Sequence, residues 1–163
     1  MSAQVDRFVH DRLPPAAQLP VFRYDLPELQ LPDQLNLVEE LLDKAAAKGF
    51  GDKPMLRSPQ GTLTYAQAAV AVNRIAQVLV EDLKLVPGNR VLLRGGNSVA
   101  MALAWLAVVK AGLIAVATMP LLRAKELGDI IEKSQPVAAL CDGRLLDELL
   151  LVQQAHPVLA TVV

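Results

Sequence analysis

From residue 90 onward, short apolar runs alternate with longer segments whose apolar residues recur every three or four positions. The first pattern is typical of buried strands and the second of helices. The alternation of the two patterns predicts strands at 90–95, 113–118, 137–142 and 158–163, separated by helices at 99–112, 123–134 and 144–156. Strands joined through helices of this length indicate right-handed crossovers. We therefore expect an α/β fold with a mostly parallel sheet and helices on both faces.

Two further helices and a hairpin are predicted ahead of this alternation. The helices begin at Asn36 and Thr64, each followed three residues later by a glutamate or glutamine in the position of a capping box. Between the helices, residues 55–57 and 62–63 have the pattern of a short hairpin.

The two ends of the chain differ from its centre. Residues 1–35 are rich in proline, which fixes backbone angles and removes hydrogen-bond donors, so we divide the chain into an extended proline-rich arm (1–35) and a partial α/β domain (36–163). We expect the last apolar strand, 158–163, to be a buried central strand in an incomplete lobe of a larger domain. Its unpaired edge predicts self-association of the isolated chain.

Composition excludes several classes of protein. The chain is 53% hydrophobic, enough for a substantial core, and its formal charge of -1 comes from scattered charges that form no basic patch. Nucleic acid is therefore not an expected partner. One cysteine and two histidines exclude an internal disulfide framework and a recognisable zinc site. These features and the charged N-terminus, which lacks a secretory signal, favour the cytoplasm.

One long apolar segment, residues 99–122, is interrupted by a single charge at Lys110. Its length meets the requirement of about 20 residues for a membrane span, but a charge at the bilayer centre costs about 2.5–3.5 kcal/mol. A lysine followed by Gly112 is typical of a helix end. We therefore expect a nearly enclosed helix, a turn and a strand, with a membrane-associated helical protein as an alternative that predicts partition into detergent.

Candidate binding residues lie where predicted strands end. Gly95 and Gly96 stand between a strand and a helix, where backbone N–H groups can hold a phosphate, but their spacing fits no standard nucleotide fingerprint. A tight turn with Asn97 or Ser98 as N-cap explains the same residues. The candidates for substrate binding beyond the carboxyl ends of the strands are Arg94, Asn97 and Arg123.

Cys141 and Asp142 end another predicted strand. A nucleophilic thiol needs a basic partner, whereas a small buried side chain explains Cys141 without one. Asp142 is expected to cap the following helix rather than to bind a metal. We assign no catalytic or metal-binding residue, because no convergent set of acid, base, nucleophile or phosphate cradle can be assembled.

Several motifs occur in a characteristic order: "LTYAQ", "GNRVLL", "AWLAVVKAGLIAVATMPLLRAKEL" and "IIEKSQPVAALCD". This series resembles the N-terminal part of the AMP-forming acyl-CoA synthetases of the adenylate-forming superfamily, and residues 11–49 are similar to the benzoate and 2-aminobenzoate CoA ligase branch. The resemblance implies an enzyme that attaches AMP from Mg²⁺-bound ATP to a carboxylic acid and then transfers the acyl group to the thiol of coenzyme A.

The resemblance also implies parts that residues 1–163 do not contain. These are a Ser/Thr/Gly-rich phosphate loop, a ribose-binding aspartate and a lysine from a mobile C-terminal domain, so we expect these 163 residues alone to be inactive and to bind none of the cofactors. No lysine of the chain matches the catalytic one. The alternative is a stand-alone, non-catalytic α/β module that binds a nucleotide or a partner protein.

Overall fold

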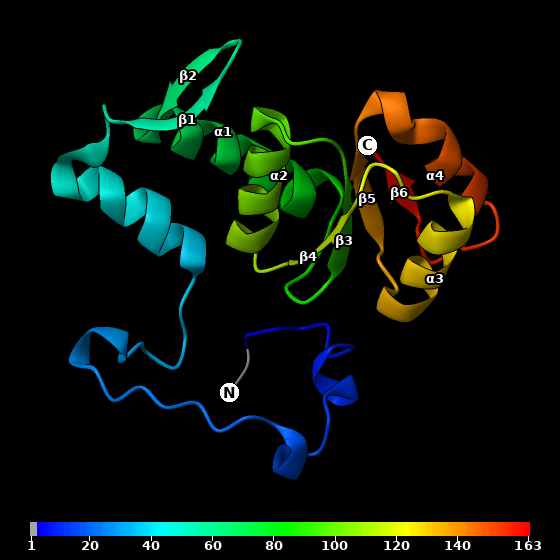
Figure 1. Cartoon of the computed structure of the whole chain (residues 1–163), viewed down its shortest axis with the longest axis horizontal. Coiled ribbons are helices and arrows are strands. Elements are labelled where there is room, and N and C mark those ends of the chain that lie inside the picture. Colours follow the sequence, from blue (N-terminus) through cyan, green and yellow to red (C-terminus); the bar gives the residue numbers. More distant parts are fainter. Residues whose placement is uncertain (1–2) are drawn as a thin grey trace.

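A four-stranded parallel sheet lies at the centre of the chain, whose computed structural model describes residues 3–163 (Figure 1). The strand order is β4-β3-β5-β6, and all three neighbouring pairs are parallel. The strands span Arg90–Arg94 (β3), Ile114–Thr118 (β4), Ala138–Cys141 (β5) and Thr161–Val162 (β6). The predicted parallel sheet is confirmed.

Helices cover both faces of this sheet, as predicted (Figure 1). One face packs against α1 (Tyr65–Gln77) and α2 (Val99–Lys110), and the other against α3 (Ala124–Ser134) and α4 (Leu146–Gln153). Successive side chains of a strand point to opposite faces. Val91 and Leu93 of β3 accordingly join the first core, whereas Leu92 joins the second. The continuous apolar run of β3 thus serves two cores at once.

The first core includes the segments that precede the sheet. An antiparallel hairpin of β1 (Pro54–Ser58) and β2 (Gly61–Thr64) leads into α1. The predicted capping box is present, because the Thr64 hydroxyl accepts from the Gln67 N–H and the Gln67 side chain accepts from the Thr64 N–H. Shorter helical segments complete the chain: 3₁₀ turns at His10–Arg12, Ala16–Gln18, Pro27–Leu29 and Gly143–Leu145, and π-helical segments at Glu39–Asp43, Ala46–Phe50 and Val78–Asp82.

The charge of Lys110 is paired with a carboxylate elsewhere in the fold. Its ammonium group contacts both carboxylate oxygens of Asp43 at 2.8 Å, and Gly112 turns the chain with a φ of 72°. The predicted helix, turn and strand are therefore confirmed. Within residues 3–163, no helix is both long and apolar enough to cross a membrane.

One expectation about burial is wrong. The helix at 99–112 is not nearly enclosed: Leu106 and Ala107 are buried, but Ala100 is exposed and the Trp105 side chain is 37% exposed, because α1 and the sheet cover only part of the surface of α2. β6 pairs only with β5, and no other strand of residues 3–163 lies along its outer edge, which is the unpaired edge that was expected. Its central position in a larger domain stays a prediction.

The predicted arm differs in character from the domain. Residues 10–35 are exposed throughout, and Figure 1 shows them running outside the packed helices and sheet. The segment includes three 3₁₀ turns and no strand. The division at residue 35 remains a prediction, although the residues on its two sides differ clearly in burial.

Candidate functional site

The topology identifies one edge of the sheet as the candidate site. From β3 the chain passes through α2 to β4 on one side, and then through α3 to β5 on the other side of β3. Open α/β sheets bind ligands beyond the carboxyl ends of their strands, at the point where the order reverses in this way. Here that point lies between the ends of β3 and β5, where Arg94 is paired in register with Cys141.

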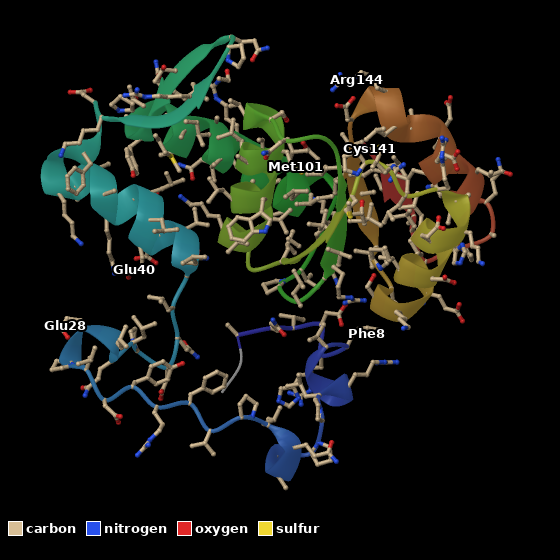
Figure 2. All side chains as sticks on the ribbon, in the orientation of Figure 1. Phe8, Glu28, Glu40, Met101, Cys141 and Arg144 are labelled. Atoms are coloured by element: carbon tan, nitrogen blue, oxygen red, sulfur yellow. The ribbon has the colours of Figure 1, made fainter. Side chains whose placement is uncertain are left out.

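A hollow of about 290 Å³ lies at this reversal point. Its lining is mainly apolar and includes Gly95, Met101, Leu140 and Cys141. In Figure 2, Met101 lies on α2 and Cys141 lies at the end of β5. A Cβ on Gly95 would lie 2.5 Å from the terminal methyl of Met101, so glycine leaves room for the methionine. The volume is near the lower limit for a small-molecule site, roughly 300 Å³.

The turn after β3 leads into α2, and Ser98 rather than Asn97 is its N-cap. The Ser98 hydroxyl accepts from the Met101 N–H at 3.1 Å and so caps α2. Asn97 is exposed, and its side chain has no hydrogen-bond partner among residues 3–163. Its amide is therefore able to contact a ligand beyond this end of the sheet.

Arg94 is only 1% exposed, and its guanidinium is held by backbone carbonyls. Its Nε donates to Leu145 at 3.2 Å, its Nη1 to Met119 at 3.3 Å, and its Nη2 to Pro120 at 3.4 Å and Leu122 at 2.8 Å. Arg94 thereby fixes the loops that follow β4 and β5. These hydrogen bonds satisfy the buried guanidinium of Arg94 without a bound substrate. The sequence gives no sign of this role, because the acceptors are main-chain atoms 25 to 51 residues away.

Arg123 lies at the start of α3 with its side chain 78% exposed. Its guanidinium contacts the Glu148 carboxylate at 2.9 Å, and the same carboxylate accepts from the Ala124 N–H at 2.8 Å. The Ala124 N–H and then Arg123 hold the pKa of Glu148 below its usual value. Sequence analysis missed Glu148, whose acidic side chain on α4 caps the first turn of α3.

A second hollow, of about 330 Å³, is lined by two of the three predicted binding residues. Arg94 and Arg123 both line it, whereas Asn97 lines neither this hollow nor the one beside Met101. Arg144, labelled in Figure 2, lies at its rim with Asp147 and Glu148, so the positive charges of this hollow are opposed by nearby carboxylates.

The Cys141 thiol is not activated as a nucleophile. Burial raises its pKa, and the adjacent Asp142 carboxylate adds to this effect, although the charge of Arg94 opposes it. The side chain is half-buried, whereas a buried side chain was expected. A thiol with a raised pKa is mostly protonated near neutral pH, which is the less reactive form.

Asp142 caps the turn at Gly143–Leu145, as predicted. Its carboxylate accepts from the Arg144 guanidinium at 2.6 Å and from the Arg144 N–H at 3.0 Å, and these bonds lower its pKa to about 2. Over residues 3–163, no three His, Cys, Asp or Glu side chains lie close enough together to hold a metal ion.

Comparison with known proteins gives the family. The profile described as "AMP-binding enzyme" matches residues 43–163, which is most of the chain. The chain belongs to this family of adenylate-forming enzymes, whose N-terminal fold its mixed α/β architecture matches.

Three similar proteins illustrate the relationship. The benzoate–CoA ligase of Thauera aromatica is 26% identical over 120 residues, which are 74% of this chain and 23% of that protein. The salicyl-AMP ligase / salicyl-S-ArCP synthetase of Mycobacterium tuberculosis is 38% identical over 86 residues, 53% of this chain and 14% of that protein. The crystal structure of the anthranilate CoA ligase AuaEII in complex with anthranoyl-AMP superposes with a TM-score of 0.75 and 22% identity, covering 81% of this chain and 25% of that one. The chain thus spans about a quarter or less of the length of these relatives.

Proposed function

We propose that these 163 residues form a scaffold within an AMP-forming ligase that activates a carboxylic acid. The family match over residues 43–163 carries this proposal. The parallel sheet, with its reversal point between β3 and β5, supports it, because this geometry is typical of nucleotide-dependent α/β enzymes.

The proposed reaction has two steps. A carboxylate is a poor electrophile, so its oxygen first attacks the α-phosphorus of ATP, which releases pyrophosphate and forms an acyl-adenylate. The sulfur of coenzyme A then attacks the acyl carbonyl and loses its proton to water, AMP departs with the electrons of the broken C–O bond, and a thioester forms. ATP and coenzyme A are thus the proposed co-substrates, with Mg²⁺ as the expected counterion of the phosphates. We assign no step and no ligand residue to Mg²⁺.

The proposed acid is aromatic, with benzoate and 2-aminobenzoate as the first choices. The three relatives above are named for benzoate, salicylate and anthranilate, each a benzene ring with one carboxyl group. Asn97 and Arg123 are the described side chains best placed to contact a ligand at the carboxyl edge, since both are exposed there. We propose that Arg94 positions the adjoining loops and does not bind the substrate itself.

The polypeptide encoded by the complete reading frame around these residues provides the test. It is incubated with ATP, Mg²⁺, coenzyme A and either benzoate, 2-aminobenzoate or an aliphatic acid, and acyl-CoA products are identified by mass spectrometry. We expect aroyl-CoA and AMP with an aromatic acid. Thioester formation from aliphatic acids alone would overturn the substrate class, and no thioester from any acid would overturn the proposed function.

The isolated 163-residue chain gives a second comparison. We propose that it is inactive and that the complete enzyme works in the cytoplasm. Calorimetry with ATP, AMP and coenzyme A should show no tight binding to the isolated chain. Tight binding of a nucleotide would instead favour a stand-alone nucleotide-binding module.

A further inference from the structure

The first described residues contact the end of the sheet opposite to the candidate site. We call residues 3–9 the clasp and residues 10–35 the strap. The backbone N–H groups of Val5 and Asp6 both donate to the Pro87 carbonyl, at 2.8 and 2.9 Å. The Asp6 carboxylate accepts from Asn89 Nδ2 at 2.8 Å and also pairs with Arg90. Both partners lie at the amino end of β3.

Arg90 connects the clasp to the core. Its side chain is buried, and besides Asp6 it donates to the Ser134 carbonyl at 3.0 Å and the Gln135 carbonyl at 2.8 Å, at the end of α3. The Phe8 ring lies over its guanidinium, with 4.3 Å between the Arg90 Cζ and the ring centroid. Asp6 supplies the carboxylate for this buried cation, and Phe8 stacks on its face.

Gly88 shows how closely the clasp approaches the domain. It has a φ of 93°, and a Cβ built at this position would overlap the backbone oxygen of Asp6. Gly49 has a similar φ of 80° but no atom within 4 Å of an added Cβ. Comparing alanine at these two glycines therefore separates obstruction of the clasp from backbone strain.

The strap is attached independently at its other end. Asn36 donates through its amide to the Lys110 carbonyl at 2.9 Å, while its amide oxygen accepts from the Val38 N–H at 3.0 Å. The chain then enters a helical segment in which Val38 and Leu42 are completely buried. This attachment rests on the core itself, whereas the clasp is attached by backbone hydrogen bonds to Pro87, by the Asp6 carboxylate and by the stacking of Phe8 on Arg90.

A hollow of about 690 Å³ lies between the two attachments. It is lined by Ala3 from the clasp, by Asn36 and by Gly112 after α2, and the strap residues 10–32 are not part of its lining. The strap therefore stands away from the core between its fixed points (Figure 1). Releasing the clasp would free the strap without removing a core side chain.

We propose that the clasp is a releasable latch, controlled by Asp6, that holds the exposed strap closed at the amino end of the sheet. The strap stays anchored at Asn36 when the latch opens, so a segment attached to the domain at both ends becomes attached at Asn36 alone. This is a conformational device separate from the carboxyl edge, and it does not depend on the proposed ligase activity.

Hydrogen–deuterium exchange of the 163-residue chain tests the latch. Asp6→Asn removes the charge with little change of shape, and Asp11→Asn is the matched control, since Asp11 is an exposed carboxylate on the strap that pairs with Arg7 and His10. We expect Asp6→Asn to speed exchange at Val5, Asp6 and Phe8 by roughly tenfold or more, with β3 and α2 unchanged. Asp11→Asn should leave all of these amides as in the wild type.

A steric pair of variants provides an independent test. Gly88→Ala should open the latch without changing any charge, whereas Gly49→Ala should not affect residues 5–8. Unchanged exchange at residues 5–8 in Asp6→Asn would show that Asp6 does not control the latch. Loss of protection in β3 together with the clasp in Asp6→Asn would show that the clasp is part of the core, and either result overturns the proposal.

Discussion

At the scale of single residues, the main feature is a pair of buried arginines at opposite ends of β3. Arg90 is 4% exposed and Arg94 is 1% exposed. Each binds backbone carbonyls from distant segments, but only Arg90 also has a carboxylate partner. A planar guanidinium with five donors suits this task, because one side chain can satisfy several carbonyls together. The two arginines fix the loops at the amino and carboxyl ends of the strands.

Arg94→Met should destabilise the fold strongly. The substitution keeps an apolar stem but leaves the carbonyls of Met119, Pro120, Leu122 and Leu145 without their donor. We expect a loss of about 3 kcal/mol in the free energy of unfolding, measured by urea titration. Arg123→Met is the control and should have a much smaller effect, because that side chain is 78% exposed. Equal effects of the two substitutions would contradict this role for Arg94.

The Cys141 thiol should react slowly in the folded chain. Burial raises its pKa, and it is the only cysteine of the sequence, so a thiol reagent reports on this position alone. At about pH 7.5 we expect the folded chain to react with a disulfide reagent roughly tenfold more slowly than the urea-unfolded chain. Faster reaction in the folded state would show that the fold activates the Cys141 thiol, contrary to this prediction.

At the scale of elements, the N-termini of α1 and α3 are capped in two different ways. Thr64 and Gln67 cap α1 within one segment, whereas Glu148 of α4 caps α3 from a neighbouring helix. The first device is local and has a sequence signature. The second depends on how the helices pack, and for this reason it was not predicted.

Thr64→Ala tests the local cap. It removes the acceptor for the Gln67 N–H, and we expect the free energy of unfolding to fall by about 1 kcal/mol in urea titration. Thr62→Ala in the same hairpin is the control, because Thr62 is exposed and does not cap a helix. A loss as large in the control would show that the effect comes from the hairpin and not from the cap.

Glu148→Gln tests the cap between helices through its pH dependence. The folded-state pKa of Glu148 lies below its ordinary value of 4.5, so its contribution to stability is present above that pH and is lost as the pH falls through the folded value. We expect Glu148→Gln to lower the urea midpoint near pH 7, with the difference from wild type shrinking as the pH falls below 4.5. Glu132→Gln on the exposed face of α3 is the control. A difference independent of pH would contradict the role of the carboxylate.

At the scale of the whole molecule, the sequence pattern predicted more of the fold than of the site. The apolar runs of β3, β4 and β5 and the spacing within the helices are local signals, so the elements and the parallel sheet could be predicted. The partial exposure of α2 could not, because it depends on which surfaces other segments cover. For the same reason, the sequence could not distinguish Arg94, which is held by carbonyls, from the exposed Asn97.

The isolated chain should also self-associate. The outer edge of β6 pairs with no strand of residues 3–163, and unpaired strand edges favour association. Sedimentation velocity at increasing concentration should show growing oligomers, and Val162→Lys should reduce them by placing a charge on this edge strand. A chain that stays monomeric at all concentrations would contradict this prediction.

The central claim is that these residues are the scaffold of an enzyme that forms acyl-adenylates. The most direct measurement is acid-dependent exchange of labelled pyrophosphate into ATP by the polypeptide of the complete reading frame, because this exchange reports adenylate formation without coenzyme A. We expect exchange when benzoate or 2-aminobenzoate is added and none without an acid. A folded, full-length polypeptide that catalyses no exchange with any carboxylic acid would contradict it.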